Sequence, residues 1–284
     1  MRFEAPGTID GAVALLAAEP GLTRVLAGGT DVLVQLRSGM VEPELIVDIK
    51  RIPGMFDVVE EGGGWRIGAA VPGMQLGDHE GVSARWPGVV EAVGLVGSTQ
   101  IQGRATLGGN LCNASPAADS VPAMIAADAV ARVHGPDGTR DVPAGEIATG
   151  PGRTQLLKGE IVGSIFLPAR PANASDAYLR FIPRTEMDIA VVGAAVSLVM
   201  DGDVVADARV ALGAVAPTAR LVPDGAAALI GRTIDAAEDE LKAAASAACA
   251  PINDKRGTIA FRTHVAGVLA ARAARIAARR ATGG

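Results

Sequence analysis

The sequence predicts an α+β protein with two domains. Its 284 residues are enough to build two hydrophobic cores. Up to residue 170, short apolar runs typical of strands are interspersed with segments of helical periodicity. A linker-like stretch follows at residues 170–175 (Arg-Pro-Ala-Asn-Ala-Ser), and beyond it two long strands precede two helices. We therefore place a first domain at residues 1–170 and a second at residues 176–284.

Composition excludes several classes of protein. Hydrophobic residues make up 49% of the chain but aromatic residues only 3%, so Ala, Val, Leu and Gly must fill the cores. No apolar run approaches the roughly 18 residues of a membrane-spanning helix, and no signal peptide follows Met1. We expect a cytoplasmic protein. The net charge of −5 argues against nucleic-acid binding, and two distant cysteines cannot by themselves hold an iron–sulfur cluster or a zinc ion.

The elements of the first domain follow from local patterns. Thr8 is a candidate N-cap for a helix at residues 8–19, which Pro20 and Gly21 end. Thr30 is a second candidate cap, for a helix that ends at Gly39. This and other helical patterns lie at 31–38, 72–79, 87–96 and 119–127. Strands are predicted at 24–27, which we expect to be buried, and at 44–49, 65–70, 129–134, 140–142 and 160–167.

The second domain is predicted to begin with a β-hairpin. Residues 189–200 and 204–214 have the composition of long strands, and Asp201, Gly202 and Asp203 form a turn between them. An Ala-rich helix follows at residues 235–249. A last helix at 258–280 is predicted to bury one apolar stripe, made of Phe261, Val265, Val268, Leu269 and Ile276.

Two glycine-rich turns carry the strongest functional information. They are Ala-Gly-Gly-Thr-Asp at residues 27–31 and Thr-Leu-Gly-Gly-Asn at residues 106–110. Because glycine lacks a Cβ, its backbone can approach a phosphate closely and direct N–H groups at it. The second turn lies in an aperiodic polar stretch, residues 97–116, which we interpret as a functional loop. Together the turns predict a diphosphate held between them, as in a dinucleotide.

Other motifs for nucleotide binding or hydrolysis are absent. The sequence has no P-loop, and residues 62–68 (Gly-Gly-Gly-Trp-Arg-Ile-Gly) fail the Rossmann spacing and are interpreted as a hairpin turn. It also lacks a nucleophile elbow and a His-Glu-x-x-His sequence. The chain therefore has a cofactor site without recognisable acid–base or nucleophilic machinery.

The two turns and residues 113–119 (Asn-Ala-Ser-Pro-Ala-Ala-Asp) resemble the FAD-binding medium subunit of the molybdenum hydroxylases, the family of xanthine dehydrogenase and aerobic carbon monoxide dehydrogenase. The resemblance covers essentially the whole chain. Residues 157–161 match the end of the family's flavin domain, and Tyr178, Arg180, Arg184 and residues 188–190 match the start of its C-terminal domain. The resemblance implies a PCMH-type FAD-binding domain of two subdomains and a smaller α+β C-terminal domain of sheet and helices.

The resemblance also implies which residues bind FAD. The backbone of both turns would enclose the diphosphate, and Asp119 would accept a hydrogen bond from the cofactor. Val162 would contact the adenine end through its backbone, and Arg180 would place a cation near the flavin or the phosphates. Tyr178 and Asp188 are looser candidates for flavin neighbours. The full set is Val25, Leu26, Ala27, Gly28, Gly29, Thr30, Asp31, Thr106, Gly108, Gly109, Asn110, Asp119, Val162 and Arg180.

Partner subunits are implied as well. A small subunit would carry two [2Fe–2S] clusters and a large subunit the molybdopterin cofactor, in a dimer of heterotrimers. This chain would take electrons from the clusters and pass them to an external acceptor. We expect the FAD to be non-covalent, because the first turn has neither His nor Cys. Carbon monoxide dehydrogenases typically have His and Ser in place of Thr30 and Asp31, which argues against carbon monoxide as the substrate.

Two alternatives remain open at this point. The chain could be a free-standing PCMH-type flavin oxidase or dehydrogenase, although it has no visible catalytic base. It could also be a binding module for another phosphorylated ligand, without a redox role. For Cys112 we favour a small buried residue over a place on the electron route.

Overall fold

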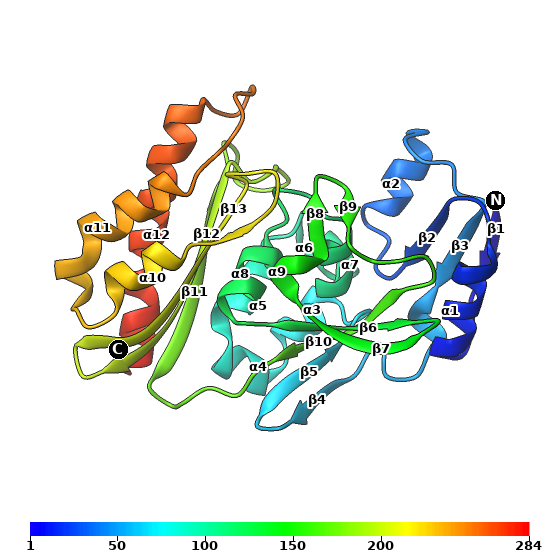
Figure 1. Ribbon diagram of the computed structural model, residues 1–284, viewed down its shortest axis with the longest axis horizontal. Helices are drawn as coiled ribbons and strands as arrows, with labels where there is room; N and C mark the ends of the chain where they lie inside the picture. Colours follow the sequence, from blue (N-terminus) through cyan, green and yellow to red (C-terminus); the bar gives the residue numbers. More distant parts are fainter. Residues whose placement is uncertain (284) are drawn as a thin grey trace.

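Three β-sheets and a short two-stranded ribbon organise the computed structural model, which describes residues 1–283 (Figure 1). The first sheet is parallel, in the order β1-β3-β2, with β1 at Arg2–Glu4, β2 at Thr23–Leu26 and β3 at Leu45–Asp48. Helix α1 (Ile9–Ala18) lies between β1 and β2 in the chain, and the Thr8 hydroxyl accepts a hydrogen bond from the Gly11 N–H at 3.1 Å. That N-cap was predicted and is confirmed. Helix α2 (Val32–Arg37) and the 3-10 turn η1 (Ile49–Arg51) complete this part.

The second sheet is antiparallel, in the order β4-β5-β10-β6-β7. Its strands are β4 (Val58–Glu61), β5 (Gly64–Gly68), β6 (Val130–Gly135), β7 (Gly138–Pro143) and β10 (Ile161–Leu167). Gly62 and Gly63 form the turn between β4 and β5, as predicted. The helices that follow β5 are α3 (Gly73–Gly77), α4 (Glu80–Arg85), α5 (Pro87–Val93), α6 (Thr99–Gln102), α7 (Leu107–Cys112) and α8 (Ser120–Ala126). Helix α9 (Ala144–Ile147) leads into the ribbon of β8 (Ala148–Gly150) and β9 (Arg153–Thr154).

The third sheet has the order β11-β12-β13-β14, all antiparallel. Its strands are β11 (Ala174–Phe181), β12 (Val192–Asp201), β13 (Val204–Gly213) and β14 (Arg220–Leu221). One face is covered by α10 (Pro223–Leu229), α11 (Ile234–Ala247) and α12 (Ile259–Ala281), and the other packs on α5 and α8 (Figure 1). Two hydrophobic cores result, one around the first two sheets and one between the third sheet and its helices.

A buried polar contact fastens the third sheet to the helices before it. The two carboxylate oxygens of Asp176 on β11 accept hydrogen bonds from the Val89 N–H of α5 at 3.2 Å and from Arg170 at 3.1 Å. The Arg170 guanidinium also lies over the Trp86 ring, 4.0 Å from its centroid. From the other side, Arg280 of α12 donates to the Asp176 carbonyl at 2.9 Å. These contacts fix the position of β11, which carries two of the candidate site residues.

Two segments have a different structure from the one predicted, namely the loop at residues 97–116 and the linker at residues 170–175. Residues 97–116 contain α6 and α7, so the second glycine turn is the start of a helix. Glycine lowers helix propensity, but Thr106 caps α7 by accepting the Gly109 N–H at 2.9 Å. Strand β11 begins at Ala174, within the predicted linker, because the tertiary contacts of Asp176 stabilise a polar residue in a buried strand.

Three smaller predictions also fail. Thr30 does not cap α2, which begins after Asp31 and has no side-chain cap. Strand β2 is only half-buried, with Val25 37% exposed, because it lies at the edge of its sheet. The expected stripe of α12 is incomplete, since Phe261 is 41% exposed and the buried face is mainly alanine. Alanine and Gly267 let α12 pack closely, and a Cβ on Gly267 would come within 2.8 Å of the Lys242 carbonyl of α11.

No helix within residues 1–283 has the length and the apolar character needed to cross a membrane.

Candidate functional site

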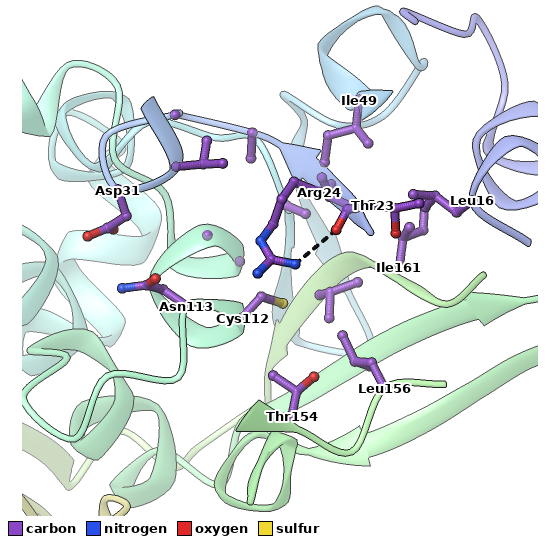
Figure 2. Close-up of a pocket in the computed structure, with 18 of the residues that line it drawn as sticks. Leu16, Thr23, Arg24, Asp31, Ile49, Cys112, Asn113, Thr154, Leu156 and Ile161 are labelled. Carbon is purple, nitrogen blue, oxygen red and sulfur yellow. Dashed lines mark hydrogen bonds between the residues drawn. The ribbon is translucent and has the colours of Figure 1, made fainter. Parts of the chain in front are cut away.

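A cleft of about 690 Å³ lies between the first sheet and the segments around α7 and β10 (Figure 2). This volume is in the range of sites for small molecules and cofactors. Both glycine turns line it, together with α2, the start and end of α7, and the segment before β10. The cleft therefore brings together two turns that are far apart in the sequence.

The first turn leaves β2 and lies against the backbone that leads into the second turn. A Cβ on Gly28 would come within 1.9 Å of the Arg104 carbonyl oxygen and 3.2 Å of the Ala105 Cα, so a larger residue cannot occupy this position. Gly29 has a φ of +81°, in the left-handed region that favours glycine. The Lys50 ammonium donates to the Ala27 carbonyl at 3.1 Å and thereby ties the turn to η1. The close backbone contact thus explains the glycine at position 28, and the positive φ explains the glycine at position 29.

The second turn presents a bare backbone to the cleft. A Cβ on Gly108 would lie 2.9 Å from the Ala69 carbonyl oxygen, which explains why this residue is glycine. At Gly109, which lines the cleft, an added Cβ would meet only the Thr106 hydroxyl, at 3.0 Å. The space beyond Gly109 is therefore open to a ligand. A side chain at this position would fill space that a phosphate group could otherwise occupy.

A side-chain hydrogen bond joins α2 to the end of α7 beside the cleft. The Gln35 amide donates to the Asn113 side-chain oxygen at 3.1 Å, and both residues line the cleft. Helix α2 has no buried residue, so little packing holds it in place. This contact therefore contributes to keeping α2 over the cleft.

Four charged residues line the cleft, namely Arg24, Asp31, Lys158 and Glu160. Glu160 is already paired, because Arg140 donates to both its oxygens at 2.8 and 2.9 Å. That contact lowers the pKa of Glu160. Loss of hydration beside the cleft raises the pKa of Asp31.

Cys112 points its sulfur into the cleft from the end of α7 (Figure 2). Burial raises the pKa of this thiol to about 12, so it is neutral at physiological pH. A neutral, partly buried thiol has the properties of a small packing residue, in agreement with the interpretation that the sequence favoured.

The cleft gathers most of the predicted site residues. Those that line it are Val25, Ala27, Gly28, Gly29, Thr30, Asp31, Thr106, Gly108, Gly109, Asn110 and Val162. Leu26, Asp119 and Arg180 are not among the lining residues. The looser candidate Asp188 lies in the loop after β11, where it pairs with Arg184 and Arg256.

Asp119 and Arg180 contact each other. The two oxygens of Asp119 accept hydrogen bonds from the Tyr178 hydroxyl at 2.9 Å and from Arg180 at 2.8 Å. Asp119 is only 8% exposed, and its burial raises its pKa to about 6, against the opposing effects of Arg180 and Tyr178. The group is connected to the cleft, because Asn110 accepts from the N–H and the hydroxyl of Ser120, the residue after Asp119.

Several lining residues were not assigned a role from the sequence. Gln35 and Arg24 lie next to the first turn, but a single polar side chain in a helix or a strand carries no recognisable motif. Asn113 and residues 157–161 belong to segments that supported the family resemblance, so they could have been named from it. Thr154 ends strand β9 and Leu156 follows it, and the sequence did not predict the ribbon β8–β9.

Comparison with known protein families gives two matches that together span most of the chain. The family model described as the FAD binding domain in molybdopterin dehydrogenase matches residues 1–170. The model described as the CO dehydrogenase flavoprotein C-terminal domain matches residues 177–277.

Individual relatives agree with these matches. The chain is 35% identical to the carbon monoxide dehydrogenase medium chain of Hydrogenophaga pseudoflava over 277 residues, covering 96% of each protein. It is 34% identical to a xanthine dehydrogenase FAD-binding subunit of Escherichia coli over 218 residues, covering 76% of this chain and 74% of that one. Among solved structures, carbon monoxide dehydrogenase from Oligotropha carboxidovorans matches with a TM-score of 0.94 and 31% identity, covering 99% of this chain and 98% of that one.

The buried group around Asp119 generates a prediction about pH. In the unfolded chain the pKa of an Asp is about 3.9, and in the folded protein that of Asp119 is about 6. The folded state therefore binds this proton more tightly, and protonation of Asp119 adds to the free energy of unfolding as the pH falls from 7 to 4. The quantity to compare is the free energy of unfolding of the wild type minus that of Asp119→Asn. We expect this difference to rise by about 2 kcal/mol between pH 7 and pH 4.

The measurement is urea unfolding of both proteins at several pH values. Asp137→Asn, which removes a carboxylate in the exposed turn between β6 and β7, is the matched control. A difference for Asp119→Asn that is constant, or that decreases toward low pH, would contradict a raised pKa at this site.

Proposed function

We propose that this chain, which belongs to the family of FAD-binding medium subunits of the molybdenum hydroxylases, is the electron-transfer subunit of a heterotrimeric molybdenum hydroxylase. The proposal is supported above all by the cleft with both glycine turns on its walls, where Gly28 packs against the backbone of Arg104 and Ala105, just before the second turn. The family is that of the flavoprotein subunits of carbon monoxide and xanthine dehydrogenase-type oxidoreductases.

The residues of the cleft fit a flavin dinucleotide. The bare backbone at Gly109 leaves open space for a phosphate, and Gly28 lets the opposite turn approach it. Thr30 and Asn110 supply polar groups beside these positions, and Val162 lies in the wall formed by β10. Apolar side chains also line the cleft, among them Leu22, Val25, Val96 and Ile161. A diphosphate beside the turns and flat ring systems against these apolar groups would agree with this lining.

Bound FAD would supply two-electron redox chemistry, which no side chain of this chain provides. The protein would contribute position and electrostatics. The turns would hold the diphosphate, the Gln35–Asn113 contact would keep α2 over the cofactor, and Arg180 would provide positive charge near the flavin. Asp119, held by Tyr178 and Arg180, would keep that cation in place. We retain Leu26, Asp119 and Arg180 as members of the proposed FAD site.

The proposed partners complete the enzyme. Relatives are named as medium chains or medium subunits, for example of carbon monoxide dehydrogenase and of nicotine 6-hydroxylase. We propose a small subunit with two [2Fe–2S] clusters and a large subunit with a molybdopterin cofactor, arranged as a dimer of heterotrimers in the cytoplasm. Within this chain we propose the boundaries 1–170 for the FAD-binding domain and 176–284 for the C-terminal domain.

The first prediction from this proposal is that the chain binds one FAD without a covalent bond. Cys112 is the thiol in the cleft, and its high pKa keeps it protonated and unreactive. Acid precipitation of the yellow protein should release the flavin into the supernatant, where chromatography identifies it as FAD. Flavin that stays with the pellet, or a colourless protein that cannot be reconstituted, would contradict the prediction.

The second prediction concerns Gly109→Val. The backbone of Gly109 is helical and an added Cβ would press only on the Thr106 hydroxyl, at 3.0 Å, but the branched side chain would project into the space proposed for phosphate. We expect flavin content after purification to fall at least tenfold, measured from the absorbance ratio of flavin to protein. The far-UV circular dichroism should be unchanged.

Gly77→Val is the matched control for this substitution. Gly77 also lies in a short helix, α3, and an added Cβ there would meet only Val90, at 3.9 Å. This variant should keep its flavin. If Gly109→Val retained normal flavin content, the second turn would have only a structural role.

The third prediction concerns the partners. Pull-down of the tagged chain from its native host should recover a small subunit with about eight cluster cysteines, since two [2Fe–2S] clusters need four ligands each, and a large subunit. The chain by itself should oxidise no aldehyde, purine or N-heterocycle. If it instead migrates alone on size exclusion and oxidises an organic substrate unaided, it is a free-standing flavin enzyme.

A further inference from the structure

The outer edge of the third sheet is held by charged side chains of two helices. Strand β11 pairs with β12 on one side and is the outer strand of its sheet. On its other side, the Tyr178 N–H donates to a carboxylate oxygen of Glu91, on α5, at 3.0 Å. Near the end of α12, Arg280 donates to the Asp176 carbonyl at 2.9 Å and pairs with the other oxygen of Glu91. These two side chains therefore satisfy backbone groups that a further strand would otherwise pair.

Tyr178 is fixed at both of its ends. Its backbone N–H is bound by Glu91, and its hydroxyl donates to Asp119 at 2.9 Å. The residue is only 3% exposed. On the neighbouring strand β12, a Cβ on Gly193 would lie 2.4 Å from the hydroxyl oxygen and 3.2 Å from ring carbons. Because the ring is rigid and closely packed, a displacement of the Tyr178 backbone must also displace its hydroxyl.

The hydroxyl in turn supports a buried ion pair. The other oxygen of Asp119 accepts from Arg180 at 2.8 Å, and the two side chains are 9% and 5% exposed. A buried carboxylate is costly unless its oxygens are hydrogen-bonded. Displacement of the Tyr178 hydroxyl would leave one oxygen of Asp119 without this partner. The position of the Arg180 cation therefore depends on where Tyr178 is held.

We propose that Glu91 is a positioning residue for the flavin. This inference rests on the proposed function, in which Arg180 provides positive charge near the flavin. Glu91, oriented by Arg280, holds the backbone of Tyr178. The Tyr178 hydroxyl holds Asp119, and Asp119 holds Arg180. A cation near the isoalloxazine stabilises reduced, anionic flavin, so Glu91 raises the flavin potential through Arg180.

The first measurement is the midpoint potential of FAD bound to the full chain. Glu91→Ala removes the acceptor of the Tyr178 N–H. We expect the ratio of the affinities for reduced and oxidised flavin to fall about tenfold, which lowers the potential by about 30 mV for a two-electron couple. Glu91→Gln keeps an oxygen acceptor and loses the charge, so its potential should lie between those of Glu91→Ala and the wild type. Arg279→Gln removes a neighbouring exposed cation of α12, and its potential should equal that of the wild type.

The second measurement needs no flavin. Urea unfolding of the flavin-free wild type, Glu91→Ala, Tyr178→Phe and the double variant gives a double-mutant cycle. Tyr178→Phe removes only the hydroxyl. If Glu91 positions this hydroxyl on Asp119, part of its contribution is already lost in Glu91→Ala. We expect the fold-decrease in the folding equilibrium constant that Tyr178→Phe causes to be at least about threefold smaller in Glu91→Ala than in the wild type.

Each outcome has a distinct meaning. If the cycle is additive, Glu91 does not position Tyr178, and the inference is wrong while the proposed function stands. An unchanged potential in a Glu91→Ala protein that retains FAD would leave Glu91 a structural role only and would also overturn the inference. If the wild type binds no FAD, the proposed function fails and the inference fails with it. Should Glu91→Ala not fold, as judged by circular dichroism, Arg280→Gln takes its place, and a potential equal to that of Arg279→Gln would overturn the inference.

Discussion

The close contact between the backbones of Gly28 and Arg104 determines the form of the cleft. A Cβ on Gly28 would lie 1.9 Å from the Arg104 carbonyl oxygen, a separation at which two atoms cannot coexist. The contact joins the end of the parallel sheet to the segment that starts α7, and the cleft is enclosed between these two parts. Because these two segments meet, the glycines of the first turn and the open backbone of Gly109 line the same cleft.

The polar interior of the molecule extends from this cleft to the third sheet. Asn110 lines the cleft and accepts hydrogen bonds from Ser120, and the neighbouring Asp119 is held by Tyr178 and Arg180 on β11. Strand β11 is fixed in turn by the contacts of Asp176 with α5 and Arg170. A buried carboxylate is tolerated at each position because its oxygens are satisfied. These hydrogen bonds connect the third sheet to a cleft whose lining residues all lie between Leu16 and Val162.

The sequence predicted the architecture better than the contacts within it. Periodicity located most strands and helices. The two glycine turns were recognised because each is a short run of adjacent residues in the sequence. Helix α7 was missed because its two glycines have low helix propensity, although the Thr106 hydroxyl caps it. The pairing of Asp119 with Tyr178 and Arg180 joins residues 59 and 61 positions apart, and no local pattern encodes such a distance. Arg24 was missed for a related reason, since its place in the cleft depends on how β2 faces α7.

We propose that one flavin dinucleotide lies between the two glycine turns. Hydrogen–deuterium exchange of the full chain, with and without FAD, tests this placement because it reports on individual backbone segments. We expect slower exchange with FAD at residues 25–38 and 107–113, and unchanged exchange in α11 and α12. Slower exchange confined to the C-terminal helices, or no change at either glycine turn under saturating FAD, would contradict it.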